Sequence, residues 1–212
     1  METVSFKTRV KNMLIESAKH YNDYYLKYSY LLCSNAFHDN DFYIIQANET
    51  NFLHLTGVHT ILSPKEFFQK CYKATLDESD FDFVKEGKSE KEVIGSVRRK
   101  INALPHIFDL MQETTLVEEN FKKNTISCSF GAGSTYCTLG FSISKTVKPK
   151  SLLKGMELDY ARSEKLILVL RGAQGAGRFD SLIVGTIKDI QERKEILGPL
   201  LSENLLKLLS VE

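Results

Sequence analysis

The spacing of apolar residues changes near residue 125, and this change limits the folds available to the chain. Before it, apolar residues recur at three- and four-residue steps in several stretches, the spacing of amphipathic helices. From Thr125 onward, apolar and polar residues alternate, which predicts strands. Helices followed by strands are typical of α+β proteins. We predict an antiparallel β-sheet of four to six strands packed against amino-terminal and central helices, with a short carboxy-terminal helix.

A chain of 212 residues suits one well-filled core, so we predict a single domain over residues 1–212. Its expected segments are an amino-terminal helix at 1–33, a strand hairpin at 42–60, a helical segment at 63–117, antiparallel strands at 124–188 and terminal helices at 189–210. Serine followed three residues later by glutamate, at Ser63–Glu66 and at Ser89–Glu92, predicts two capped helix starts.

Tyrosines crowd the second half of the predicted first helix. They are Tyr21, Tyr24, Tyr25, Tyr28 and Tyr30. Beside His20 and Lys27, such rings can stack on nucleic-acid bases. Tyrosines on a helix that packs across a sheet are commoner, so we favour packing.

Composition points to an ordinary soluble protein, with 42% hydrophobic and 26% charged residues. The segment Met1–Lys7 has no apolar signal-peptide core, and no window is apolar enough to span a membrane, so we expect an intracellular protein. The cysteines form no C-x-x-C pair, which predicts reduced, buried thiols at Cys33, Cys71, Cys128 and Cys137.

The net charge of +1 hides an asymmetry. Residues 121–180 hold ten Lys and Arg against four Asp and Glu, a balance of +6, which leaves −5 for the remainder. This bias fits an anionic partner such as RNA. Lysines spread along strand edges also serve solubility, and the pattern favours neither reading over the other.

The most distinctive segment is Asn51–His59, which reads N-F-L-H-L-T-G-V-H. Its alternation predicts a half-buried strand with His54 and Thr56 on one face. A titratable imidazole beside a hydroxyl on a rigid strand is a plausible catalytic platform, although most strand histidines are structural.

The five histidines match no metal-binding spacing, so we predict no metal and no cofactor. The catalytic set that remains is His54, Thr56, Arg171 and Lys165, with His59, Ser134, Thr135, Tyr136 and Arg178 as substrate-binding residues. This set suits RNA cleavage by attack of the 2′-OH, in which a histidine moves protons and a cation stabilises the phosphorane.

Two glycine-rich loops can be interpreted either as structural turns or as binding loops. The loop Arg171–Arg178 lacks a G-K-[ST] ending and precedes a strand, so a hairpin loop is favoured over a phosphate loop, while its two arginines remain able to grip a phosphodiester. Gly131–Tyr136 predicts a tight hairpin turn.

With the Phe52–Val58 motif F-L-H-L-T-G-V followed by Ser63–Phe68, the chain resembles phage- and mobile-element-associated domains of the barnase, EndoU, colicin E5/D and RelE-like superfamily of metal-free nucleases. The resemblance implies an antiparallel sheet on helices, cleavage of RNA such as tRNA, a toxin or defence setting with an antitoxin or inhibitor partner, and a place in the cytoplasm of a bacterial or phage-infected cell. His54 and Thr56 match the motif directly.

Two alternatives stay open. The first is a non-enzymatic module that binds RNA or protein, with the H-L-T-G segment purely structural. The second is an ADP-ribosyltransferase-like enzyme, because such enzymes also carry a histidine on an early strand and Arg162-Ser163-Glu164 is similar to an R-S-E series. The order of this series relative to the histidine does not fit that pattern.

Overall fold

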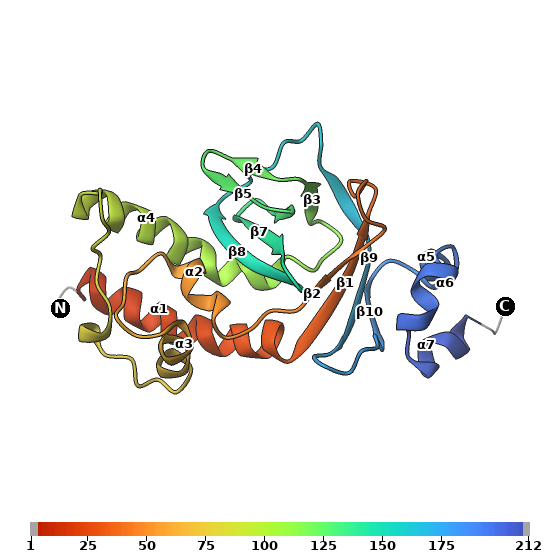
Figure 1. The fold of residues 1–212 in the computed structure, drawn as a ribbon, viewed down its shortest axis with the longest axis horizontal. Coiled ribbons are helices and arrows are strands. Elements are labelled where there is room, and N and C mark those ends of the chain that lie inside the picture. Colours follow the sequence, from red (N-terminus) through yellow and green to blue (C-terminus); the bar gives the residue numbers. More distant parts are fainter. Residues whose placement is uncertain (1–3, 210–212) are drawn as a thin grey trace.

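A computed structural model describes residues 4–209, in which seven strands close into a mixed β-barrel and an eighth extends it at one edge (Figure 1). The barrel order is β1-β2-β8-β7-β6-β3-β9, closed by pairing of β1 with β9, and β10 pairs with β9. The strands are β1 (Tyr28–Ser34), β2 (Tyr43–Ile45), β3 (Leu116–Glu119), β6 (Phe130–Gly133), β7 (Cys137–Ile143), β8 (Val147–Lys154), β9 (Glu164–Ala173) and β10 (Ser181–Val184). A separate small hairpin joins β4 (Lys122–Lys123) to β5 (Ile126–Ser127).

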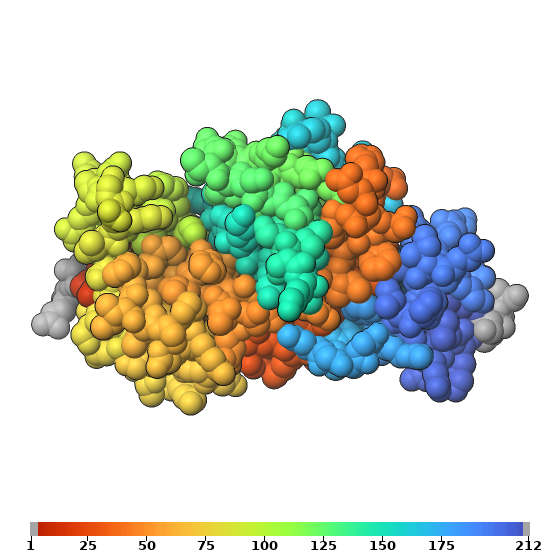
Figure 2. All heavy atoms as spheres, in the orientation of Figure 1, coloured from red at the N-terminus to blue at the C-terminus, as the bar shows by residue number. Residues whose placement is uncertain are grey.

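Helices lie at both ends of the barrel (Figure 1). The amino-terminal group consists of α1 (Phe6–Tyr21), a π-helical turn η1 (Asn22–Leu26), α2 (Asn51–Thr56), α3 (Pro64–Tyr72), η2 (Glu78–Asp80), α4 (Glu90–Ala103) and η3 (Leu104–Asp109). The carboxy-terminal group consists of α5 (Ile187–Gln191), α6 (Lys194–Leu197), η4 (Gly198–Leu200) and α7 (Glu203–Leu208). Figure 2 shows the α3 and α4 region and the carboxy-terminal helices at opposite ends of the molecule.

Strand β1 is buried on both faces. Tyr30 and Leu32 face the main core, which fills the barrel and continues between the amino-terminal helices. Leu31 and Cys33 face a second core, built from the outer face of β9 and the carboxy-terminal helices. Since successive side chains of a strand point to opposite faces, one short strand joins the two cores.

Two acidic residues at neighbouring positions of β3 are buried, and each has bonding partners. Glu118 pairs with Arg162 and accepts the backbone N–H of Asp159 at 2.7 Å. Glu119 accepts the backbone N–H of His38 at 2.6 Å and the Tyr43 hydroxyl. Buried carboxylates with such partners avoid most of the cost of lost hydration. They tie the loops on either side of the barrel to its wall.

The predicted open antiparallel sheet of four to six strands is wrong, because long-range pairings close the strands into a barrel. β1 pairs with β9 from Tyr28↔Ala173 onward, and β2 pairs with β8 in parallel at Ile45↔Val147. Neither pairing joins neighbours in sequence. Alternation of side chains can identify a strand, but it does not identify the strand's partners.

The predicted amino-terminal helix at 1–33 is too long. It ends at Tyr21, passes through η1, and gives way to β1 at Tyr28. Because β1 is buried on both faces, it lacks the polar alternation that marks a half-buried strand. Residues 1–3 and 210–212 lie outside the described residues, so part of the Met1–Lys7 segment and the last position of the predicted terminal helices fall there.

Several local predictions are confirmed. Ser63 and Ser89 each form a capping box, with Glu66 and Glu92 respectively. β9 and β10 form the expected antiparallel hairpin. The four cysteines are free and buried. Among residues 4–209, no helix combines the length and the apolar character needed to cross a membrane.

Gly172 in β9 tests how tightly the following loop packs on the barrel. A Cβ built on Gly172 would lie 2.2 Å from the carbonyl oxygen of Arg178, a backbone atom with little freedom to move. We expect Gly172→Ala to lower the free energy of unfolding by about 1–3 kcal/mol in urea denaturation. Gly198→Ala is the matched control, since its Cβ would meet nothing within 4 Å. Equal stability of the two variants would contradict the close packing.

Candidate active site

The segment predicted as a strand around His54 is instead the short helix α2. Phe52, Leu55 and Thr56 are buried, whereas His54 is exposed. Buried positions at i, i+3 and i+4 follow the helical period. The predicted strand hairpin at 42–60 is therefore wrong beyond β2. The apolar residues of this six-residue segment fit both the two-residue period of a strand and the 3.6-residue period of a helix, so the pattern does not distinguish the two.

The turn after α2 explains the T-G pair of the motif. Gly57 has φ +77°, a left-handed conformation that ends helices and that glycine adopts without strain. The buried Thr56 hydroxyl donates to the carbonyl oxygen of Leu53 at 2.8 Å and accepts the N–H of Val58 at 3.4 Å. Thr56 thus shapes the turn from inside the protein. This turn connects His54 to His59 along the chain.

These residues form one wall of a surface pocket of about 300 Å³. The pocket is lined by Leu53, His54, Gly57, Val58, His59, Val84, Lys85 and Lys100. Three separate segments therefore contribute: α2 with its turn, the loop before α4, and α4 itself. Two imidazoles and two ammonium groups share this pocket.

His59 is held by a carboxylate. Its Nδ1 lies 2.9 Å from Asp82 Oδ1, and the two residues also exchange backbone hydrogen bonds at 3.1 and 2.9 Å. Asp82 is fixed in turn by the N–H of Val84, at 2.9 Å. A carboxylate that accepts from Nδ1–H selects the tautomer whose Nε2 is free to take a proton. The contact with Asp82 thus fixes the orientation of the His59 ring.

Lys100 connects α4 to the H-L-T-G segment. Its Nζ donates to the carbonyl oxygen of His54 at 2.8 Å, and its aliphatic stem packs against Gly57. Burial, and then the nearby charge of Lys85, lower the pKa of Lys100 to about 8. A partly desolvated ammonium interacts more strongly with an anion than a hydrated one does.

The pocket suits an anionic substrate and proton transfer. Imidazole is the side chain most often used for proton transfer in catalysis, and lysines can stabilise charge on a phosphate. Among the residues that the structure describes, no group of three or more His, Cys, Asp or Glu side chains is placed to hold a metal ion.

Of the predicted catalytic and binding residues, only His54 and His59 line the pocket. Arg171 and Lys165 lie on β9 and do not line it. Ser134 and Thr135 form the turn between β6 and β7, where the Ser134 hydroxyl accepts the N–H of Tyr136 at 3.3 Å. The Tyr136 ring stacks on His106, with ring centroids 4.5 Å apart.

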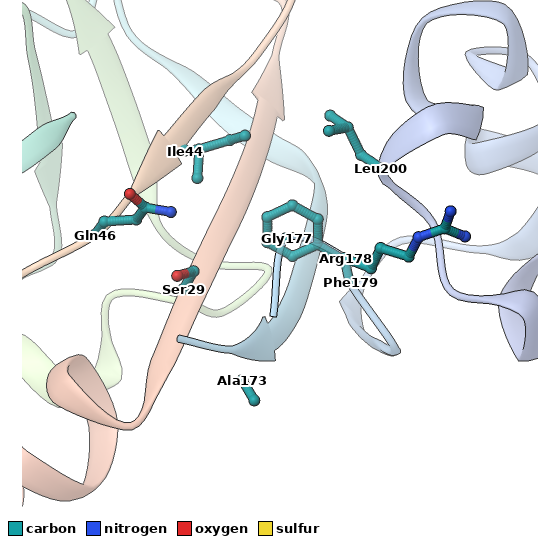
Figure 3. Close-up of a pocket in the computed structure, with 8 residues that line it drawn as sticks. All are labelled: Ser29, Ile44, Gln46, Ala173, Gly177, Arg178, Phe179 and Leu200. Atoms are coloured by element: carbon teal, nitrogen blue, oxygen red, sulfur yellow. The ribbon is translucent and has the colours of Figure 1, made fainter. Parts of the chain in front are cut away.

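Arg178 borders a different and smaller cavity of about 80 Å³ (Figure 3). Figure 3 shows its guanidinium directed away from that cavity, toward the carboxy-terminal segment. There Nη1 donates to the carbonyl oxygen of Leu201 at 3.3 Å. In this structure Arg178 therefore anchors the carboxy-terminal helices to the loop after β9.

Sequence reasoning missed three residues of the site, namely Asp82, Lys85 and Lys100. Lys100 lies 46 positions from His54, and Asp82 lies 23 positions from His59. Asp82 sits in an acidic loop and Lys100 in a basic stretch of α4, so neither differs from its charged neighbours. Only the tertiary contacts single them out.

Comparison with protein families identifies the chain. Residues 13–158 match the family described as phage-Barnase-EndoU-ColicinE5/D-RelE like nuclease 4. The chain belongs to this family. The matched segment includes every residue of the His54 pocket, whereas β9, β10 and the carboxy-terminal helices follow it. No curated protein and no solved structure matches the chain at a significant level.

The lowered pKa of Lys100 has a consequence for stability. The folded pKa of about 8 lies below the value of about 10.4 for an unfolded lysine, so between these values the unfolded chain binds more protons and stability rises with pH. Below pH 8 the difference is constant. The free energy of unfolding of the parent, relative to that of Lys100→Met, should therefore rise by on the order of 1–3 kcal/mol between pH 8 and about pH 10.

Urea denaturation of both proteins across this pH range measures the difference. The comparison cancels groups that titrate equally in parent and variant. If the difference in the free energy of unfolding between the two proteins did not change with pH, Lys100 would keep its ordinary pKa in the folded protein.

Proposed function

We propose that this nuclease-family protein is a metal-independent endoribonuclease whose active site is the His54 pocket. The observation that carries the proposal is the joint presence of His54, the oriented His59 and the partly buried Lys100 around one cavity. Two proton-transfer groups and a cation are what cleavage by an internal 2′-OH requires. His54 and Gly57 of the H-L-T-G motif line this pocket.

In the proposed reaction, one imidazole removes the proton of the 2′-OH as its oxygen forms a bond to phosphorus. The bond from phosphorus to the 5′-oxygen breaks, and the second imidazole supplies the proton that the leaving oxygen takes up. The products are a 2′,3′-cyclic phosphate and a 5′-hydroxyl. The proposal does not assign the two roles to particular residues: either His54 or His59 can be the base, and the other is then the acid.

In this proposal Lys100 stabilises the charged phosphorane, the role predicted from the sequence for Arg171 and Lys165. Thr56 acts as a positioning residue, because its hydroxyl holds the turn that presents His54 and His59. The proposed substrates include transfer RNA, in a toxin or phage-defence setting. An inhibitor protein would be expected to cover the same pocket.

His54→Ala tests the proposal directly. The side chain is exposed, so the variant should fold with unchanged stability. Cleavage of total RNA or transfer RNA in excess EDTA should fall about 10²- to 10⁴-fold, the usual effect of removing an acid–base group. His38→Ala is the matched control, because His38 is also exposed and does not line the pocket.

Each outcome of this assay has a clear meaning. Cyclic phosphate ends that persist in EDTA and disappear in His54→Ala would support the mechanism. Cleavage abolished by EDTA would exclude a metal-independent reaction. Intact RNA with the parent protein would favour the non-enzymatic binding module.

The pH dependence of cleavage tests Lys100. Its ammonium loses a proton as pH rises through about 8, so the rate should decline above that pH. Lys100→Arg retains a charge at all accessible pH values, so the decline should move upward or vanish. Lys100→Met should lower the rate about 10²- to 10³-fold at neutral pH. Lys73→Met, at an exposed position outside the pocket, controls for loss of a surface charge. A decline that persists unchanged in Lys100→Arg would assign it to another group.

A further inference from the structure

The structure divides the five tyrosines near the end of α1 into two groups. Tyr21, Tyr25 and Tyr30 are buried, as the packing prediction expects. Tyr24 is 47% exposed, and Tyr28 is only partly buried. Packing alone does not account for the exposed side chain of Tyr24.

Arg171 of β9 lies against Tyr28. The centre of its guanidinium is 4.5 Å from the centroid of the Tyr28 ring, a cation–π contact. Its Nε is buried and has no hydrogen-bond partner. Within residues 4–209, no carboxylate forms an ion pair with Arg171, whereas Arg162 pairs with both Glu118 and Asp159. Its charge is therefore not neutralised by the protein.

Aromatic rings continue the surface away from Arg171. Tyr24 contacts Phe108 of η3 with ring centroids 5.5 Å apart, and His20 meets Phe108 edge-on at 5.4 Å. Arg171 is the cross-strand partner of Tyr30 in the β1–β9 pairing, two residues along β1 from Tyr28. We call this set the aromatic surface; its members are His20, Tyr24, Tyr28, Phe108 and Arg171.

We infer that the aromatic surface binds single-stranded nucleic acid, with a base stacked on Tyr24 and a phosphate held by Arg171. Exposed rings beside an unneutralised guanidinium suit a strand whose bases are free to stack and whose backbone is anionic. The only acid of η1, Asp23, is already paired with Lys27 at 2.7 Å. The surface thus offers, among residues 4–209, a cation without an ion pair beside the Tyr28 ring.

This inference rests on the proposed function in one respect, because it takes RNA to be the substrate. It differs in location, since none of these five residues lines the His54 pocket. Arg171 also lies beyond the family segment at residues 13–158. The carboxy-terminal strands would therefore add substrate affinity to the nuclease-family segment.

The test is the affinity for a short fluorescein-labelled oligouridylate with 2′-O-methyl sugars, measured by fluorescence anisotropy at several salt concentrations. The methylated sugar lacks the attacking hydroxyl, so binding is measured without cleavage. Tyr24→Ala should weaken binding about 10-fold, the size expected for one lost stacking contact. Tyr24→Phe should bind like the parent, since the ring remains. Tyr160→Ala, at a side chain that is 71% exposed elsewhere, is the control.

Arg171→Gln should weaken binding and reduce the slope of log Kd against log salt by about 0.7, the value for one phosphate contact on a single strand. Parent affinity in both Tyr24→Ala and Arg171→Gln would overturn the inference, as would a parent protein that does not bind the oligonucleotide. Because Tyr24 is exposed, its variant keeps the test valid even if Arg171→Gln unfolds.

The two proposals fail separately. If His54→Ala abolishes cleavage while Tyr24→Ala and Arg171→Gln bind normally, the aromatic surface is wrong and the active site stands. If the parent cleaves no RNA but its binding depends on Tyr24 and Arg171, the aromatic surface stands and the endoribonuclease proposal is wrong.

Discussion

The pairing of β1 with β9 is the interaction on which the rest of the structure depends. It joins the start of the barrel to a strand more than 130 residues later, with partners from Tyr28↔Ala173 to Ser34↔Leu166. It closes the barrel and creates the two buried faces of β1, one for each core. Bringing such distant segments together costs loop entropy, and the burial of Leu31, Leu32 and their neighbours offsets that cost.

The candidate active site depends on this barrel indirectly, through the helices that pack on it. α2 and α4 both contact β8, so the barrel wall sets the distance between them. The bond from Lys100 to the His54 carbonyl then connects the two helices directly. The backbone bridge between His59 and Asp82 fixes the third segment. Contacts between these three segments therefore set the geometry of the pocket.

In our proposals, the His54 pocket carries out the chemistry and the aromatic surface binds the substrate. His54 and His59 line the pocket, and the aromatic surface contains the exposed Tyr24 ring and the Arg171 guanidinium, which has no ion pair within residues 4–209. Arg171 and Lys165 were expected to stabilise the phosphorane because they are basic residues on a strand. Arg171 lies over Tyr28. We propose that it contacts a phosphate there and raises the affinity for a nucleic-acid strand, while Lys100 acts in the chemical step. Electrostatic attraction of this kind acts mainly on binding.

The sequence by itself determined the features that neighbours in the chain control. Ser63 and Ser89 cap helices through glutamates three residues away, β9 turns back into β10, and the H-L-T-G segment stands out because of its residue types. Only the tertiary structure decided that this segment is a helix, that residues 28–34 form a strand, and that the sheet closes. It also brought Asp82 to His59 and Lys100 to His54. The physical reason is that capping and turn formation are local, whereas strand partners and pocket walls are chosen by burial between segments far apart in the chain.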